Sequence, residues 1–472
     1  MRGRRAIAAL LAGLLAGCAV GPNYKRPELT TPENYYAHAG AAEERALTDA
    51  PWWEVFDDPV LKTLVDEALA KGFDARLALA RVDEAHARYG IARSAYWPQV
   101  DYQVAAGRER PSEFVNPAAL GESGNVYSAS VALGWEIDLW GRVRRLNESA
   151  LASYLATEEA RRGVYLAVVT EVARAYFDLL ELDAELAIAK RTAASFQDTY
   201  DLFNRRLEGG AASALETSRA QAALEDTLAQ IPDIERRIVA TENELNLLVG
   251  RPPQPVPRGA PLDAQKASPE IPAGLPSALL ERRPDVREAE QALHAANAGI
   301  GVAVANFFPQ ISLTGLLGGV SDDLSEVFGT GKTWSVAAGL LGPIFQGGRL
   351  RREKEVAVAQ FEQAKVVYER AVTAAFADVS TTLISREKLI DIRLASSKAV
   401  DAYSEAVRIA NVRYESGKSS YFEVLDAMQQ LFPAEQRLAR AKRDELTAVV
   451  DVYGALGGGW QLEEAAAKPQ EP

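Results

Sequence analysis

The residues of this chain that could perform chemistry are few and scattered. The stretch GTGKT, 329–333, resembles the end of a phosphate-binding loop, but the full pattern needs glycine where Glu326 stands and a helix where a strand is expected. The histidines, His38, His86 and His294, lack the spacing of zinc ligands. No Ser-His-Asp arrangement is visible, so we expect no enzyme activity, no metal site and no cofactor other than a covalent lipid.

Two polar stretches repeat each other, and both predict a tight turn between helices. RLEGGAASALETSRAQ (206–221) and RYESGKSSYFEVLDAM (413–428) share six of sixteen residues at an offset of 413 − 206 = 207. In each, a glycine follows a long helical pattern, in the place of a left-handed cap. Ser-x-x-Glu then predicts a capping box that opens the next helix. The residues of the two tips are Arg206, Gly210, Ser213 and Glu216, and Arg413, Gly417, Ser420 and Glu423.

These tips belong to two long helical hairpins, 141–248 and 348–456, within a tandem repeat. Proline is absent from 141–207 and from 348–414, so each stretch is predicted to form one helix of 67 residues. Pro232 and Pro433 should bend the returning helices. The predicted organisation is a signal peptide at 1–17, an extended segment at 18–58, repeat 1 at 59–250, a proline-rich connector at 251–274, repeat 2 at 275–457 and a tail at 458–472.

Each repeat also carries a strand pair, about 99–139 in repeat 1 and about 310–345 in repeat 2. In YSASVALGWEIDL, 127–139, apolar residues alternate with polar or small ones. A half-buried strand of a soluble sandwich gives the same alternation. The length and the aromatic residues favour a strand that crosses a membrane. Four strands cannot close a barrel and a bilayer tolerates no open edge, so we expect three chains to supply twelve strands.

The N-terminus and the composition limit location and partners. MRGRR followed by the apolar stretch 6–16 is typical of a secretory signal. The signal ends in Leu-Ala-Gly-Cys18, and this only cysteine resembles the lipid-modified residue of bacterial lipoproteins. Ala19, in place of aspartate, favours the outer membrane. The alternative is an incidental cysteine in an ordinary signal. A formal net charge of −13 argues against a nucleic-acid partner.

Several segments resemble the TolC-like outer-membrane factors, specifically the NodT-like lipoprotein channels of RND-type efflux systems. The resemblance implies a mainly α protein with a membrane β-barrel portion. Three chains would form a twelve-stranded outer-membrane β-barrel continuous with a twelve-helix periplasmic α-barrel. It also implies a periplasmic adaptor and an inner-membrane RND-type transporter as partners in a Gram-negative bacterium. The matching segments are 14–27, WWEVFDDPVLKTLVDEAL (52–69), LPSALLERRPDVREAE (275–290), FFPQISL (307–313), PIFQGGRLR (343–351) and RYESGKSSYFEVLDA (413–427).

The resemblance also assigns roles at the tips. In that family an apolar ring and an aspartate ring narrow the duct, and these positions fall on Phe422 and Asp426. Helical spacing alone shows only that Asp426 shares a polar face with Phe422, where the alternative is a solvated charge. The tips would contact the adaptor and close the duct at rest. Met428 departs from the glutamine that relatives often have. A protein-secretion duct and a non-channel lipoprotein scaffold remain as alternative functions.

Overall fold

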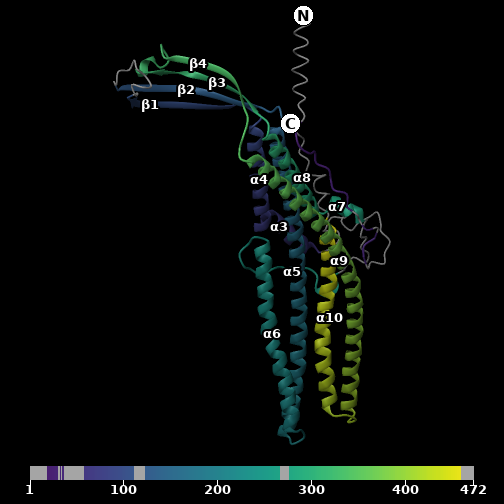
Figure 1. Ribbon diagram of the computed structural model, residues 1–472. Coiled ribbons are helices and arrows are strands. Elements are labelled where there is room, and N and C mark those ends of the chain that lie inside the picture. The colour runs from purple at the N-terminus through teal and green to yellow at the C-terminus, as the bar shows by residue number, and fades with distance from the viewer. Residues whose placement is uncertain are drawn as a thin grey trace. The chain divides into compact units, whose positions relative to one another are not determined.

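The computed structural model (Figure 1) describes residues 19–29, 32, 34–36, 58–110, 123–265 and 276–458. The predicted signal peptide, the predicted lipidation residue Cys18 and residues 459–472 lie outside the described residues. The chain divides into two compact units, each considered by itself below. Unit 1 comprises 1–28, 82–157 and 288–369, and unit 2 comprises 29–81, 158–287 and 370–472.

The elements occur in two sets of the same order. The first set is α3 (Pro59–Lys71), α4 (Phe73–Ser94), β1 (Gln99–Glu109), β2 (Gly124–Ile137), α5 (Arg142–Glu208) and α6 (Ala214–Leu248).

The second set follows the connector and repeats this order. It consists of α7 (Leu279–Arg282), α8 (Pro284–Ala305), β3 (Gln310–Ser321), β4 (Lys332–Leu341), α9 (Arg349–Glu415) and α10 (Tyr421–Ala455). Short 3-10 helices lie at Leu262–Ala264, Pro276–Ala278 and Leu324–Glu326.

The two sets match in length as well as in order. Helices α5 and α9 have 67 residues each, and α6 and α10 have 35 each. The starts of α5 and α9 differ by 349 − 142 = 207 residues, the offset that the sequence shows. Pro232 and Pro433 both lie inside continuous helices. The GTGKT stretch begins in a turn, and its last two residues, Lys332 and Thr333, already belong to β4, so a strand and not a helix follows the turn.

The described residues of unit 1 form a four-stranded antiparallel sheet in the order β1-β2-β3-β4. Val131 of β2 lies opposite Tyr102 of β1 and Leu317 of β3. Leu317 in turn lies opposite Trp334 of β4, so an apolar row crosses the whole sheet. Because side chains alternate along a strand, the neighbouring row belongs to the other face. That row is small and polar, and consists of Gln103, Ser130, Gly318 and Thr333.

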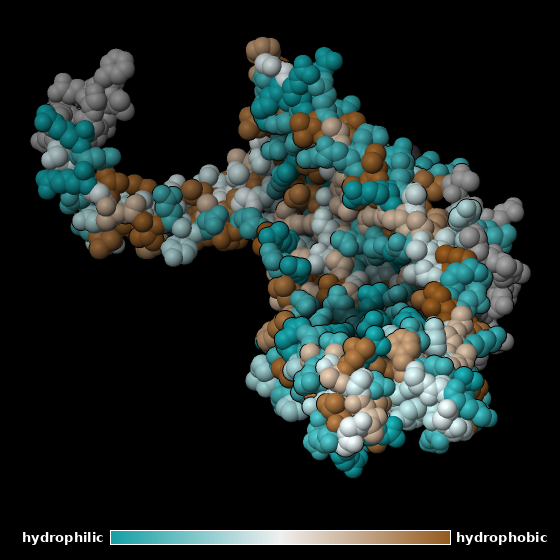
Figure 2. Space-filling view, turned by 90° about the horizontal axis from the view of Figure 1, so that it is seen from below, coloured by the Kyte–Doolittle hydropathy of each residue, from teal (hydrophilic) through white to brown (hydrophobic). Residues whose placement is uncertain are grey.

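The sheet is exposed on both faces and along both edges. Every residue of β1 and of β4 is exposed. Figure 2 shows the apolar side chains, in brown, gathered along this sheet. An apolar face and two unpaired edges are not stable in water, because both the side chains and the backbone groups require partners.

In unit 2, α5 packs against both returning helices. Phe196 of α5, Leu224 of α6 and Leu425 of α10 belong to one buried cluster. Leu182 of α5 and Phe432 of α10 belong to another. The two tips are therefore connected through a shared core. None of the helices in the described part of the chain offers an 18-residue stretch apolar enough to cross a membrane.

Candidate functional site: the two helical tips

Both long helices end in the same backbone motif. Gly210 and Gly417 have φ angles of 70° and 67°, a left-handed conformation that glycine adopts without strain. At the first tip the amide of Ala211 donates to the carbonyl of Arg206 at 2.7 Å, and the second tip repeats this bond at 2.8 Å. These bonds satisfy carbonyls that the helix end leaves free. The predicted glycine positions therefore form two equivalent turns.

The first tip forms the predicted capping box. The hydroxyl of Ser213 accepts from the backbone amide of Glu216 at 3.3 Å. The carboxylate of Glu216 accepts in return from the amide of Ser213 at 2.9 Å. The backbone amide and the hydroxyl of Ser213 hold the pKa of Glu216 below its usual range. Helix α6 thus begins with two of its free donors satisfied.

The second tip does not form this box, so the prediction for Ser420 and Glu423 is wrong. In the described chain the side chain of Ser420 makes no capping hydrogen bond. The carboxylate of Glu423 instead accepts from Nε of Arg413 at 3.2 Å. The guanidinium of Arg413 therefore competes successfully with the backbone amide of Ser420. Both partners of this ion pair are about half exposed, so the pair is screened by solvent.

An aromatic cluster joins the two tips, and we call it the tip cluster. Arg206 donates to the hydroxyl of Tyr414, and its guanidinium lies 5.4 Å from the ring centroid of Tyr414. The Tyr414 ring meets Tyr421 edge-on at 5.0 Å. Tyr421 shares a hydrogen bond of 2.6 Å with Thr199 and meets Phe203 edge-on at 4.7 Å. Burial raises the pKa of Tyr421, so its hydroxyl stays protonated.

Phe422 and Asp426 lie one turn apart near the start of α10. Phe422 is 56% exposed. The guanidinium of Arg219, from α6, lies 5.2 Å from the centroid of the Phe422 ring. Asp426 is exposed and forms no ion pair with any residue that the structure describes. Arg219 is the repeat-1 equivalent of Asp426, because 426 − 219 = 207.

From the sequence, Arg219 was noted only because its charge is opposite to that of its repeat equivalent, Asp426. Its contact with Phe422 was not predicted, nor was the tip cluster. The signal available was the pair of tyrosines, Tyr414 and Tyr421, on either side of the second turn. Aromatic residues that flank a turn can meet only if the hairpin closes, so they mark its packed side.

Helix α5 also carries two buried carboxyl groups one turn apart, which sequence reasoning missed. The side chains of Glu181 and Glu185 are 3% and 1% exposed. Glu185 accepts from Arg440 of α10 at 2.6 Å and from Arg237 of α6 at 3.1 Å. Burial and the negative charge of Glu185 raise the pKa of Glu181 to about 7. This pair links α5 to both returning helices.

Comparison with known proteins identifies the family that this chain resembles. The model of the outer membrane efflux protein family matches residues 64–251 and again 275–458. The solvent efflux pump outer membrane protein SrpC of Pseudomonas putida is 35% identical over 458 residues, 96% of this chain and 97% of that protein. The cation efflux system protein CusC of Escherichia coli is 33% identical over 451 residues, 95% and 97% of the two chains.

A solved structure agrees with these relatives. The MtrE outer membrane channel of Neisseria gonorrhoeae, in its open state, superimposes with a TM-score of 0.83 at 32% identity, over 94% of this chain and 98% of that one. The likeness therefore covers most of both chains, and it assigns the chain to transport and not to catalysis. Two family matches in one sequence also agree with the two sets of elements. This chain belongs to the outer membrane efflux protein family and is an outer-membrane efflux protein.

Proposed function

We propose that this chain is the export duct of a tripartite efflux pump and works as a homotrimer. The duct would pass drugs or other small molecules from an inner-membrane RND-type transporter and a periplasmic adaptor to the outside of the cell. The observation that carries this proposal is the four-stranded sheet, because the described part of one chain leaves its apolar face exposed and both of its edge strands unpaired on their outer side.

Membrane physics supports the trimer. Strand β2 has 14 residues and β3 has 12, each sufficient to cross a bilayer at a tilt. The apolar face can contact lipid, but unpaired backbone groups at β1 and β4 cannot. Pairing β4 of one chain with β1 of the next removes both edges. Three chains then supply twelve strands, above the minimum of about eight for a bacterial barrel.

The tips would form the periplasmic end of the duct and its gate. Phe422 and Asp426 lie exposed on one face of α10, so three chains would present three rings and three carboxylates around one axis. Crowded carboxylates repel anions and attract cations. The adaptor would contact the turns at Gly210 and Gly417 and shift the closed state to the open one by binding the open state more tightly.

The lipid anchor is a separate proposal. Cys18 directly precedes the first described segment, residues 19–29, which is held against unit 1 by the side chains of Arg145 and Asn297. A diacylglyceryl group on Cys18 would supply a second attachment to the outer membrane. Replacing Cys18 with serine should remove the lipid, which mass spectrometry of the purified protein measures directly.

One set of experiments tests the duct. We expect purified protein in mild detergent to show three times the chain mass by native mass spectrometry, and to conduct ions in a planar bilayer. Deleting the gene should raise susceptibility to a panel of drugs, and the wild-type gene should restore resistance. A protein that is monomeric under these conditions would contradict the trimer.

Two other functions predict different results. A non-channel scaffold would give no conductance, although it would still carry a lipid on Cys18. A protein-secretion duct would conduct, but its deletion would change the set of secreted proteins and leave drug susceptibility unaltered. The exposed Trp334 and Tyr102 on the apolar face disfavour the scaffold, because a periplasmic spacer has no use for such a surface.

A further inference from the structure

Within unit 1, α5 of the first set and α8 of the second set meet in a close joint. The side chain of Arg145 crosses α8 at Gly301, where an added Cβ would lie 2.7 Å from its Cγ. Ser149 donates to the carbonyl of Ala295 at 3.0 Å. Position 301 therefore has no space for any side chain while Arg145 is in place. This close contact explains why Gly301 lies inside α8, although glycine has a low helix propensity.

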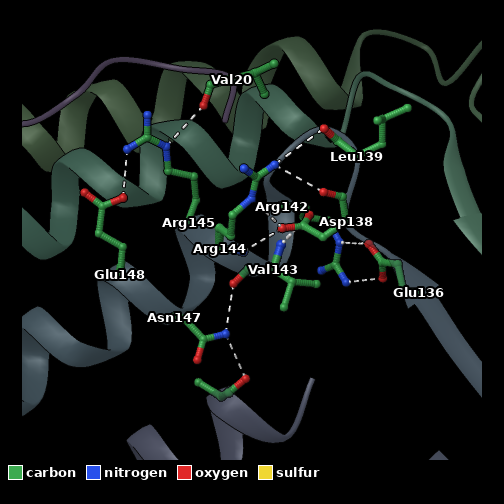
Figure 3. A network of polar contacts seen from close by, with 11 residues as sticks. Val20, Glu136, Asp138, Leu139, Arg142, Val143, Arg144, Arg145, Asn147 and Glu148 are labelled. Atoms are coloured by element: carbon green, nitrogen blue, oxygen red, sulfur yellow. Dashed lines mark hydrogen bonds and ion pairs between the residues drawn. The ribbon is translucent and has the colours of Figure 1, made fainter. Parts of the chain in front are cut away.

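Arg145 is held in the joint by several partners, and Figure 3 shows its contacts with Val20 and Glu148. It donates to the carbonyl of Val20 at 3.3 Å and to Glu148 at 2.7 Å. It also donates to the side chain of Asn23 at 2.7 Å. The Arg145 side chain is 4% exposed. The arginine is thus a buried, fully engaged part of the contact between α5 and α8.

The same residues occur a second time, on faces of α9 and α4 that the described part of the chain leaves exposed. Arg352 is the equivalent of Arg145, since 145 + 207 = 352, and its side chain is 79% exposed. It keeps the ion pair to its own helix, with Glu355 at 2.6 Å, as Arg145 does with Glu148. Ala152 is buried, whereas its equivalent Ala359 is exposed. This face of α9 therefore has the composition of an interface.

The partner face on α4 shows the same contrast. Gly90 is the equivalent of Gly301, since 301 − 211 = 90, and an added Cβ there would meet nothing within 4 Å. Ala298 is fully buried, whereas its equivalent Ala87 is exposed. The exposed Ile91 lies beside Gly90. A single chain gives no reason for a glycine at position 90.

The two helices of the joint, α5 and α8, are connected directly to two strands that pair with each other. Helix α5 follows β2, helix α8 precedes β3, and β2 pairs with β3. In the same way, α9 follows β4 and α4 precedes β1, and these are the two edge strands. The exposed face of α9 thus corresponds to the α5 side of the joint, and the exposed face of α4 corresponds to its α8 side. Together they could form the same contact that α5 and α8 make within one chain.

We propose that a second copy of this chain docks head to tail on these surfaces, with Arg352 of one copy packed over Gly90 of the next. This rests on the proposed homotrimer and identifies the residues of its interface. The occupant is a second copy because α4 carries the glycine and the alanine that α8 uses, and α9 carries the arginine and the alanine that α5 uses. Such a contact joins two different surfaces and closes when the copies form a ring.

The pair Gly90→Cys and Arg352→Cys in one chain tests this contact. We expect oxidation to link neighbouring copies, so that a non-reducing gel shows bands of two and three chain masses that disappear on reduction. Within one chain, an added Cβ at the equivalent Gly301 lies 2.7 Å from Cγ of Arg145. Because Cβ and Cγ of Arg145 are one bond apart, the two Cβ atoms are at most about 4.2 Å apart, within the usual limit of about 4.5 Å for a disulfide. The single-cysteine variants should show no such bands.

The matched control is Gly301→Cys with Arg145→Cys, which lies at the equivalent joint inside one chain. It should give a single-chain band with altered mobility and no higher bands. If the control pair closes and the Gly90 and Arg352 pair does not, the proposed contact is wrong. Dimers of the wild-type chain, in which Cys18 is the one cysteine, would instead report a free thiol at that position, and would contradict the lipid anchor without touching the interface.

A second variant tests the contact without oxidation. Gly90→Leu should lower the trimer fraction about tenfold, because a leucine would overlap Arg352 of the next copy. Adding Arg352→Ala should restore most of the trimer by making room. An unchanged trimer fraction in Gly90→Leu would overturn the proposal. Drug export is measured separately, so a trimer that fails to export would contradict the proposed function and support the interface.

Discussion

The guanidinium of Arg219 lies 5.2 Å from the centroid of the Phe422 ring. A cation of the first repeat therefore contacts an aromatic ring of the second repeat. The two residues come from α6 and α10, helices that are equivalent in the tandem repeat. At the position of Arg219 the second repeat has Asp426. At this position the two repeats have thus diverged into a cation that contacts the ring and an anion that stays exposed.

The first prediction concerns the gate. Phe422→Ala together with Asp426→Ala should raise single-channel conductance and vancomycin uptake, because the variant removes both the ring and the carboxylate proposed to narrow the duct. The matched control is Leu215→Ala, at the repeat-1 position equivalent to Phe422, which should change neither. Unaltered leakiness in the double variant would count against a gate at these residues.

The second prediction concerns the contact between Arg219 and Phe422. Arg219→Gln should weaken it, since a cation over an exposed aromatic ring contributes about 0.5–1 kcal/mol. The open state should then be populated more often, by about two- to fivefold, in single-channel recordings. If the Phe422 ring mediates this effect, adding Arg219→Gln to Phe422→Leu should change the population of the open state little further. Additive effects of the two substitutions would show that they act independently.

Much of the fold follows from local patterns in the sequence. The absence of proline and the glycine at each end predicted two helices of 67 residues, and α5 and α9 have that length. Each begins one residue later than predicted, at Arg142 and Arg349. The alternation of residues 127–139 predicted a strand with one apolar face, and the register of β2 confirms that face. Such features depend on neighbours along the chain.

The details of the tips depend on neighbours in space, and so they were not predictable. Ser213 and Ser420 have the same motif, yet only the first forms a capping box, because Arg413 takes the carboxylate of Glu423. The equivalent Arg206 instead reaches Tyr414, in the other hairpin. Two identical motifs therefore acquired different partners when the hairpins packed together.

This difference gives the third prediction. Ser213→Ala should cost about 1 kcal/mol of local stability, because it removes a capping hydrogen bond from α6. Amide hydrogen exchange in residues 214–217 should become about fivefold faster. Ser420→Ala is the matched variant and should leave exchange in residues 421–424 unaltered, since Ser420 makes no such bond. Equal acceleration at both tips would contradict the asymmetry.

The last prediction concerns pH and the buried pair Glu181 and Glu185. The pKa of Glu181 is raised to about 7 from an ordinary value of 4.5, so the folded protein binds this proton more tightly than the unfolded chain does. Its contribution to stability is therefore complete below pH 4.5 and is lost as the pH rises through 7. Glu181→Gln removes this loss, because glutamine stays neutral at every pH.

We expect Glu181→Gln to match the wild type at pH 5 and to exceed it at pH 8. The gain should be about 1–3 kcal/mol per chain, as each pKa unit corresponds to about 1.4 kcal/mol. Glu185→Gln should instead lower stability at both pH values, since Arg440 and Arg237 would lose their carboxylate partner. Thermal unfolding of the purified protein, followed by circular dichroism at each pH, measures both. Parallel profiles of Glu181→Gln and wild type between pH 5 and 8 would show that Glu181 does not titrate in this range.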